Sequence, residues 1–290
     1  TLFAITKTGE DEINLGLRKQ IDGARHMKVN GNDIQSVSGI STHVPVQLIT
    51  TNSQRFFSEG PKLRRQFIDW GVFHVKPNFL ESWRNFQTVL KQRNAAIKSK
   101  RSLKEISSWD KIFCSLGNEV HMARSDYTSE LIKLIHTILT RLLPRLNNIQ
   151  ISYKKGWNEK STLTDELNNN IQQDIQTGYT QSGPHRADIR IQSNGVPIQH
   201  VLSQGQQKIL TYAFSCAQAK LLNEKTKKSP IFLIDDLSSE LDQEKQLAII
   251  DLLNEIDNQV FITTIQPNEL HTNLTNNAKM FHMKQGNLQE

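Results

Sequence analysis

The residues best suited to chemistry are two adjacent carboxylates, Asp235 and Asp236, which follow a short apolar run. The run Ile231–Ile234 contains four apolar residues in succession, a pattern typical of a buried strand in a parallel sheet. Such strands deliver acidic side chains to the sheet edge where α/β proteins bind nucleotides and magnesium. A carboxylate after buried apolar residues is unfavourable unless it meets a cation. We therefore predict that Asp235 is a magnesium ligand; the structural alternative is that both acids cap the next turn.

A second segment, residues 202–208, precedes this strand and could bind an anion. It reads Leu-Ser-Gln-Gly-Gln-Gln-Lys and opens an apolar-periodic stretch that predicts a helix from 203 to about 224. Free N–H groups and the helix dipole make such a start attractive to phosphate. Ser203 can cap the helix and donate its hydroxyl, while Gly205 lets the backbone approach a phosphate. An ordinary serine-capped helix is the alternative.

Taken together, the two segments resemble the signature loop and the Walker B strand of ABC-type ATPase heads. This resemblance implies that Ser203, Gly205 and Gln206 contact ATP held by a twin subunit. It places Asp236 where these heads usually hold a glutamate that positions or deprotonates the attacking water. Aspartate is one methylene shorter than glutamate, so the resemblance implies slow hydrolysis.

Further positions follow from the same resemblance. Gln47 ends a predicted strand and is a candidate for the Q-loop residue that senses magnesium and the γ-phosphate, although a lone glutamine could equally be an ordinary strand residue. Thr263 or Thr264 stands where many ABC transporters have a switch histidine, which argues against a transporter. The resemblance makes Thr263 the candidate ATP-binding residue at this position. The segment at 239–242 resembles the D-loop, which meets its counterpart across an ATP-bound dimer. Its candidate residues are Ser239, Glu240 and Asp242.

One expected element is absent from the sequence. No glycine is followed by lysine, so the phosphate-binding loop GxxxxGK[ST] does not occur, and the chain opens at Thr1 directly in strand-like sequence. We expect a processed or truncated chain rather than a degenerate ATPase. ATP and Mg²⁺ are accordingly predicted cofactors of the complete protein, and these residues alone should not hydrolyse ATP.

The elements that must position these residues can be inferred from hydrophobic periodicity. Residues 1–56 predict short strands, the region from about 58 to 143 predicts two long antiparallel helices joined near 98–108, and residues 203–264 alternate helix and strand. We expect an α/β fold, namely an ABC-type ATPase head with a mixed sheet, flanking helices and an inserted antiparallel helical arm. The predicted head comprises residues 1–56 and 182–290, and the predicted arm comprises residues 57–181.

Charge suggests a nucleic-acid partner. The net charge is +6, and the segment from Arg55 to Arg101 holds eleven lysines and arginines but three acids. A basic stretch is often only a solvated helix face, but this one is longer than a helix face requires and could neutralise phosphates. The Arg64–Arg65 pair could instead serve the junction of head and arm. The residues predicted to contact DNA are Arg64, Arg65, Arg93 and Lys98.

The composition of the chain bears on where in the cell the protein acts. No apolar run approaches the roughly 20 residues that span a bilayer, and no signal peptide opens the chain, so no membrane role is expected. Cys114 and Cys216 are isolated thiols without CxxC spacing, which favours buried, reduced cysteines and a cytoplasmic protein.

Four longer segments make the resemblance more specific. Residues 64–71 read RRQFIDWG, 91–96 read KQRNAA, 182–188 read SGPHRAD and 234–242 read IDDLSSELD. In these motifs, and along essentially its whole length, the chain resembles the RecF family of bacterial recombination mediators. The resemblance implies a head related to SMC-type ATPases, an ATP-dependent homodimer, and binding of double-stranded or gapped DNA. It also implies cooperation with RecR, and with RecO, in loading RecA at gaps.

Two questions stay open at this level. His185 and Arg186 lie either in a turn before a strand or, guided by the family, against a phosphate or an interface. The chain is either a DNA-repair ATPase whose dimerisation follows ATP, or a DNA- and RecR-binding scaffold in which nucleotide is only a switch. The pairing of Ser203 and Gly205 with Asp235 and Asp236 favours the first, and the weak hydrolytic geometry favours the second.

Overall fold

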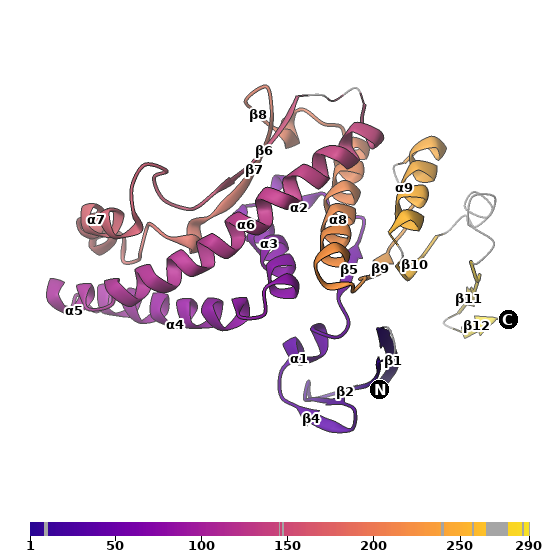
Figure 1. Cartoon of the computed structure of the whole chain (residues 1–290), viewed down its shortest axis with the longest axis horizontal. Coiled ribbons are helices and arrows are strands. Elements are labelled where there is room, and N and C mark those ends of the chain that lie inside the picture. The colour runs from indigo at the N-terminus through magenta and orange to yellow at the C-terminus, as the bar shows by residue number, and fades with distance from the viewer. Residues whose placement is uncertain are drawn as a thin grey trace.

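The computed structural model of the chain describes residues 1–8, 11–144, 146, 148–238, 241–256, 258–264, 278–285 and 287–289. A parallel sheet with two covering helices lies beside a helical arm, and a separate antiparallel sheet that contains the N-terminus lies below them in the view (Figure 1). Within the described ranges, no helix combines the length and the apolar content that crossing a bilayer requires.

The parallel sheet positions the two acids. Its strands are β5 (Val46–Ile49), β9 (Ile231–Ile234) and β10 (Val260–Ile262), in the order β10-β9-β5. In this register Ile234 pairs with Ile49 on one side and with Ile262 on the other, so all three strands end together. The alternation of the strands buries Phe232 and Ile234 on one face. Helices α8 (Gln204–Thr226) and α9 (Gln243–Glu255) follow the predicted helical segments.

The N-terminal strands form a separate antiparallel meander. Its strands pair in the order β1-β2-β3-β4 and are followed by the short helix α1. Asn30 and Gly31 have φ of 49° and 81°, as a tight hairpin turn between β3 and β4 requires. The bounds of these elements are β1 Leu2–Thr8, β2 Asp11–Lys19, β3 Arg25–Val29, β4 Asn32–Ile34 and α1 Val37–Ser41.

The arm is built on the predicted pair of long helices, α4 (Phe79–Lys98) and α6 (Asp110–Leu142). They pack through an apolar stripe in which the rings of Phe86 and Phe113 lie 5.0 Å apart. The turn between them contains a short helix that we did not predict, α5 (Leu103–Ser107), whose first turn is closed by a capping box. Two shorter helices lead into the arm, α2 (Arg55–Ser58) and α3 (Pro61–Val75).

A second antiparallel sheet joins the arm to the C-terminal half. Strand β6 (Ile149–Lys154) precedes helix α7 (Leu163–Thr177) and pairs along its length with β7 (Asp188–Ser193). Helix α6 also packs against α8. The division at residues 57 and 181 remains a proposal, since β6 lies on one side of it and β7 on the other. The remaining elements are η1 Pro184–Arg186, β8 Val196–Pro197, η2 Ile198–His200, β11 His282–Lys284 and β12 Asn287–Gln289.

Candidate functional site

Asp235 lies at the carboxyl end of the parallel sheet, immediately after β9. Its backbone N–H donates to the carbonyl of Ile49 at 2.8 Å, and its side chain is exposed. The hydroxyl of Thr263 donates to Asp235 Oδ1 at 2.8 Å and accepts from the Asp236 N–H at 3.1 Å. One threonine at the end of β10 therefore orients the acid-bearing turn at the end of β9.

Asp236 has a left-handed backbone, with φ of 54°. Its carboxylate Oδ1 accepts a hydrogen bond from Ser238 Oγ at 3.0 Å. Its carbonyl oxygen accepts from Nζ of Lys208 at 3.1 Å, and Lys208 is only 2% exposed. The turn that carries the predicted catalytic acid is thus held from α8 and from its own loop.

Ser203 caps the start of α8 and is exposed. Its Oγ accepts from the N–H of Gln206 at 3.3 Å, and the side-chain Oε1 of Gln206 accepts from the N–H of Ser203 at 3.0 Å. This capping box leaves the hydroxyl proton of Ser203 available as a donor. Gly205, in the first turn, is partly exposed. Lys208, farther along the same helix, reaches Asp236, so the predicted phosphate clamp and the acid pair are connected by one helix.

The structure describes only one of the three residues of the predicted D-loop. Ser239 and Glu240 lie outside the described residues. Asp242 caps α9: its Oδ1 accepts from the N–H of Lys245 at 3.0 Å, and its other oxygen is paired with the Lys245 ammonium. These contacts with the Lys245 ammonium and N–H lower the pKa of Asp242 below its usual value. In this chain Asp242 serves as a helix cap, which leaves open a further role across a dimer.

Gln47 is not brought to the acid pair. Its side chain is 7% exposed and its Nε2 donates to Oε1 of Gln218 on α8 at 2.7 Å. Gln218 in turn donates to the carbonyl of Phe67 on α3 at 2.8 Å. The expectation that the Gln47 amide senses magnesium and phosphate is therefore not supported, because that amide joins the sheet to two helices and lies two residues before the strand end.

The residues at the sheet edge suit magnesium bound chiefly to a nucleotide. No group of three or more histidines, cysteines, aspartates or glutamates in the described part of the chain could hold a metal by itself. Asp235 offers an exposed carboxylate, and Thr263 offers a hydroxyl beside it. Magnesium prefers oxygen ligands and commonly binds through one or two carboxylates plus substrate phosphates and water. The donor set therefore fits Mg²⁺ brought by ATP.

Arg64 and Arg65 face the protein rather than solvent. Arg64 makes a two-point pair with Asp188, at 2.7 and 3.1 Å, and its Nη1 donates to the carbonyls of Phe56 and Glu59. Arg65 donates to the carbonyl of Ala187 at 2.8 Å. The guanidinium groups therefore join α3 to the start of β7, which matches the junction role that we considered as the alternative to a DNA contact.

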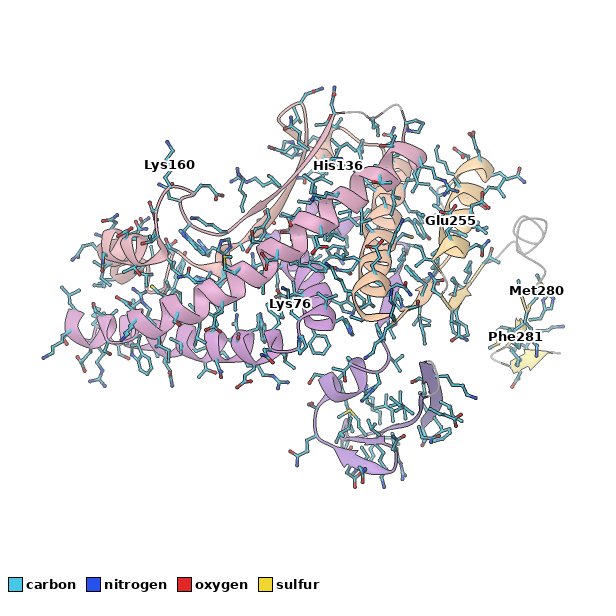
Figure 2. All side chains as sticks on the ribbon, in the orientation of Figure 1. Lys76, His136, Lys160, Glu255, Met280 and Phe281 are labelled. Carbon is cyan, nitrogen blue, oxygen red and sulfur yellow. The ribbon has the colours of Figure 1, made fainter. Side chains whose placement is uncertain are left out.

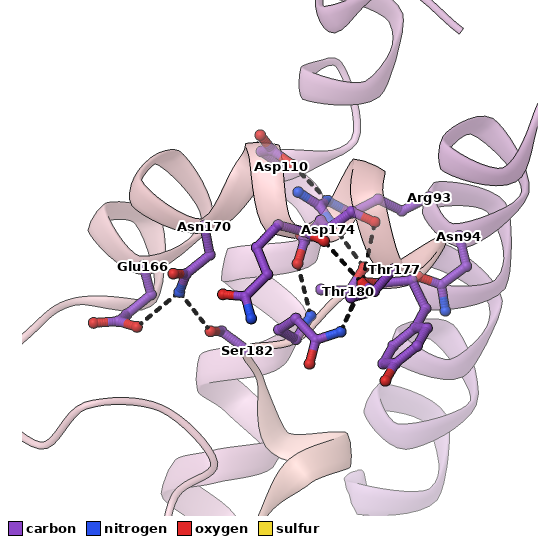
Figure 3. Close-up of polar contacts among 12 residues, drawn as sticks. Arg93, Asn94, Asp110, Glu166, Asn170, Asp174, Thr177, Thr180 and Ser182 are labelled. Atoms are coloured by element: carbon purple, nitrogen blue, oxygen red, sulfur yellow. Dashed lines mark hydrogen bonds and ion pairs between the residues drawn. The ribbon is translucent and has the colours of Figure 1, made fainter. Parts of the chain in front are cut away.

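Arg93 is completely buried, so the expectation that it contacts DNA is wrong. Its Nε donates to Asp110 at 2.8 Å, and its Nη1 donates to Asp174 and to Thr180 at 2.8 and 2.7 Å (Figure 3). Asp174 is also 0% exposed, and its second oxygen accepts from the N–H of Gln181. Arg93 ties α4, α6 and α7 together inside the arm. Lys98, five residues along α4, is exposed, and its contact with DNA remains a proposal.

His185 and Arg186 occupy different environments. His185 Nε2 donates to the carbonyl of Thr180 at 2.9 Å, and burial lowers the pKa of this histidine to about 4. A neutral, half-buried imidazole is a poor phosphate ligand, so the structure favours a structural role for His185. Arg186 is exposed; its guanidinium donates to Gln181 Oε1 at 3.3 Å and lies 5.7 Å from the centroid of the Tyr179 ring. A phosphate or interface contact of Arg186 remains a proposal.

Comparison with known proteins identifies the family. A family model described as RecF/RecN/SMC N terminal domain matches residues 4–289. The DNA replication and repair protein RecF of Coxiella burnetii (strain Dugway 5J108-111) is 43% identical over 285 residues, covering 98% of this chain and 79% of the relative. The chain belongs to the RecF family.

Other RecF proteins agree with this assignment. The DNA replication and repair protein RecF of Shewanella piezotolerans (strain WP3 / JCM 13877) is 38% identical over 287 residues, covering 99% of this chain and 79% of the relative. The solved structure of the recombination mediator RecF-ATPrS in the RecFOR pathway superposes with a TM-score of 0.81 at 21% identity, covering 99% of this chain and 78% of that one. The RecF-ATP structure gives 0.78 at 21% identity, covering 96% and 76%. The predicted fold class is therefore confirmed.

A buried arginine that our sequence analysis missed connects two of the RecF-like segments. Arg124 on α6 makes a two-point pair with Asp69 at 2.7 and 2.9 Å and donates to the carbonyl of Pro184 at 2.6 Å. It is 2% exposed and links the RRQFIDWG segment to the SGPHRAD segment. Its position on the apolar face of a long helix was the available signal, because a charged residue there must have a partner.

Proposed function

We propose that this RecF-family protein acts in recombinational DNA repair and replication by binding duplex DNA and ATP. ATP binding is supported by the position of Asp235 and Asp236 at the carboxyl edge of the parallel sheet. Thr263 orders the turn that holds these two residues, and Lys208 of α8 bonds to Asp236. Family membership and the net charge of +6 support the binding of duplex DNA.

In this proposal ATP lies between two copies of the chain. Ser203, Gly205 and Gln206 of one copy would contact the phosphates bound near Asp235 and Asp236 of the other. An exposed capping box suits this role, since the first N–H groups of a long helix can receive phosphate oxygens from outside. Magnesium would neutralise phosphate charge and be oriented by Asp235, while Asp236 would position the attacking water, with slow hydrolysis.

The proposed partners follow from the relatives. The solved structures of RecF are described as belonging to the RecFOR pathway, and we extend that association to RecR and RecO, with loading of RecA at gaps as the outcome. Two free, buried cysteines suit a cytoplasmic protein.

The second candidate function is a DNA- and RecR-binding scaffold in which nucleotide acts only as a switch. It is favoured by Asp236, which is shorter than glutamate and is partly engaged with Ser238. Under this alternative ATP would drive dimerisation and DNA binding, but substitution of Asp236 would leave both unchanged.

A complementation experiment tests the composite site. The chain is joined to a strand–loop–helix segment carrying GxxxxGK[ST], and Asp235→Asn and Ser203→Arg variants are made separately. Each variant alone should fail to dimerise with ATP. A mixture should regain dimers with one intact site, because the Ser203→Arg copy supplies Asp235 and the Asp235→Asn copy supplies Ser203.

Sedimentation and ATP turnover provide the readouts. If ATP were bound within one copy, mixing the variants would recover nothing, and the composite site would be rejected. Gln204→Ala is the matched control, since Gln204 is exposed beside Ser203 without taking part in the capping box. Both candidate functions allow an Asp236→Asn variant to dimerise, so ATP turnover separates them: turnover by the unaltered joined chain that is lost in Asp236→Asn would favour the ATPase, and absence of turnover in both would favour the scaffold.

A further inference from the structure

The end of the arm carries an exposed group of basic residues, here called the arm-tip basic cluster. The cluster surrounds the turn from α4 through α5 into α6, at the far end of the arm from the parallel sheet (Figure 1). All of its members are exposed. The members are Lys98, Lys100, Arg101, Lys104 and Lys111.

The cluster retains most of its positive charge. Residues 98–111 contain two acids, Glu105 and Asp110. Asp110 faces inward onto Arg93, so its charge is offset there. Glu105 closes the capping box with Ser102 and lies 3.7 Å from Arg101, an exposed pair of little energetic weight. The four lysines make no ion pair with any residue that the structure describes.

Helix stability does not account for all of these charges. Lys98 lies in the last turn of α4, where a cation favours the helix dipole. Lys111, by contrast, is the second residue of the long helix α6, where the dipole disfavours a cation. A basic side chain at that position is consistent with a partner outside the arm.

The tip is also held rigidly from within. Arg93 bonds to Asp110, Asp174 and Thr180, which come from the start of α6, from α7 and from the loop after it. The N–H of Thr180 donates to Asn94 Oδ1 at 2.8 Å, beside the same arginine (Figure 3). Backbone positions under the cluster are therefore fixed before any ligand arrives, which reduces the entropy lost on binding.

We infer that the arm-tip basic cluster contacts the phosphate backbone of duplex DNA. This inference rests on the proposed function, because it assigns part of the DNA contact to a particular surface. It also replaces Arg93 as a DNA contact, because the charge of Arg93 is enclosed by Asp110 and Asp174. Phosphate contacts of this kind position a protein on DNA without reading its sequence.

The test compares two fourfold variants of the chain. The tip variant carries Lys98→Gln, Lys100→Gln, Arg101→Gln and Lys104→Gln. The control carries Lys133→Gln, Lys160→Gln, Lys220→Gln and Lys284→Gln, which remove the same charge from exposed lysines elsewhere; Lys160, for example, points away from the ribbon (Figure 2). Circular dichroism and thermal unfolding verify that both variants fold.

The measurement is the affinity for a labelled duplex of about 30 base pairs, titrated across salt concentration. The tip variant should bind about tenfold or more weakly at about 0.1 M salt, and its slope of log K against log salt should be shallower by about 0.9 for each phosphate that the protein no longer neutralises. The control should lose less affinity and keep a steeper slope.

The outcomes separate this inference from the proposed function. If the unaltered chain does not bind duplex DNA, the proposed DNA binding is wrong, and so is the inference that the arm-tip basic cluster contacts DNA. If the unaltered chain binds and both variants weaken equally, the function stands and the inference is overturned. A tip variant that keeps its DNA affinity but loses an acidic protein partner would also overturn it.

Discussion

The hydroxyl of Thr263 lies 2.8 Å from Oδ1 of Asp235, at the point where two neighbouring parallel strands end. The same hydroxyl accepts the N–H of the next residue at 3.1 Å. A single side chain on β10 thus orders both the carboxylate and the backbone of the turn after β9. Thr263 therefore holds the acid-bearing turn in place.

Replacing Thr263 with valine should loosen that turn. Thr263→Val keeps the shape but removes the hydroxyl, so we expect a loss of about 1 kcal/mol in the free energy of unfolding, measured by urea titration. Thr263→Ser should restore most of it. Thr137→Val is the matched control, because the hydroxyl of Thr137 bonds only to its own helix, at Lys133. Equal stability of the Thr263 variants would contradict a holding role.

The left-handed backbone of Asp236 leads to a second prediction. A φ of 54° is strained for alanine but accessible to glycine and asparagine. We therefore expect Asp236→Ala to be less stable than Asp236→Gly by about 1 kcal/mol in urea unfolding, after allowing for the flexibility of glycine in the unfolded chain. Asp236→Asn should remain close to the unaltered chain. If alanine were tolerated as well as glycine, the turn would not require this conformation.

The buried arginine of the arm gives a third prediction. Arg93→Met would leave Asp174 without its cation in a fully buried site, so we expect a loss of roughly 3–5 kcal/mol in the free energy of unfolding. The double variant Arg93→Met/Asp174→Leu should recover part of that loss, because it removes both charges. Lys98→Met on the same helix should change stability by at most about 0.5 kcal/mol. A stable Arg93→Met single variant would contradict the proposed role of this network.

Periodicity was sufficient to predict most elements of this fold. The β5, β9 and β10 strands, the paired arm helices and the Asn30–Gly31 turn follow from alternation, apolar stripes and turn chemistry along the chain. Helix α5 was missed because its five residues carry no full apolar period; its capping box, Ser102 and Glu105, was the available signal.

The positions of the candidate site residues could be predicted where they depend on neighbours in sequence, and could not where their partners are distant. Asp235 and Ser203 lie at strand and helix ends that local patterns define. Arg93 bonds to Asp174, which lies 81 positions away in the sequence, and Gln47 bonds to Gln218, which lies 171 positions away. The sequence around Arg93 or Gln47 therefore gives no sign that the residue is buried. The sequence alone does not distinguish a basic residue that faces phosphate from one that pairs with a carboxylate inside the protein.

The free energy of unfolding should depend on pH through His185. His185 is neutral and half-buried, with its pKa lowered from 6.5 to about 4 mainly by desolvation, and also by the nearby cations Arg186, Arg65 and Arg124. The unfolded chain therefore binds a proton at this histidine between pH 6.5 and 4 that the folded chain does not. The resulting stabilisation, roughly 3 kcal/mol, should be complete above pH 6.5 and should be lost as pH falls toward 4.

Urea unfolding at a series of pH values tests this directly. His185→Gln, which can keep the hydrogen bond to the Thr180 carbonyl, should show a flatter dependence of stability on pH between 6.5 and 4. His282→Gln, at an exposed histidine, should retain the slope of the unaltered chain. His74 also has its pKa lowered to about 4, by burial and Lys228, and burial lowers the pKa of His121 as well, so part of the slope should survive in His185→Gln and should shrink further in the double variant with His74→Gln. A slope unaffected by either substitution would mean that both imidazoles can take up protons in the folded protein.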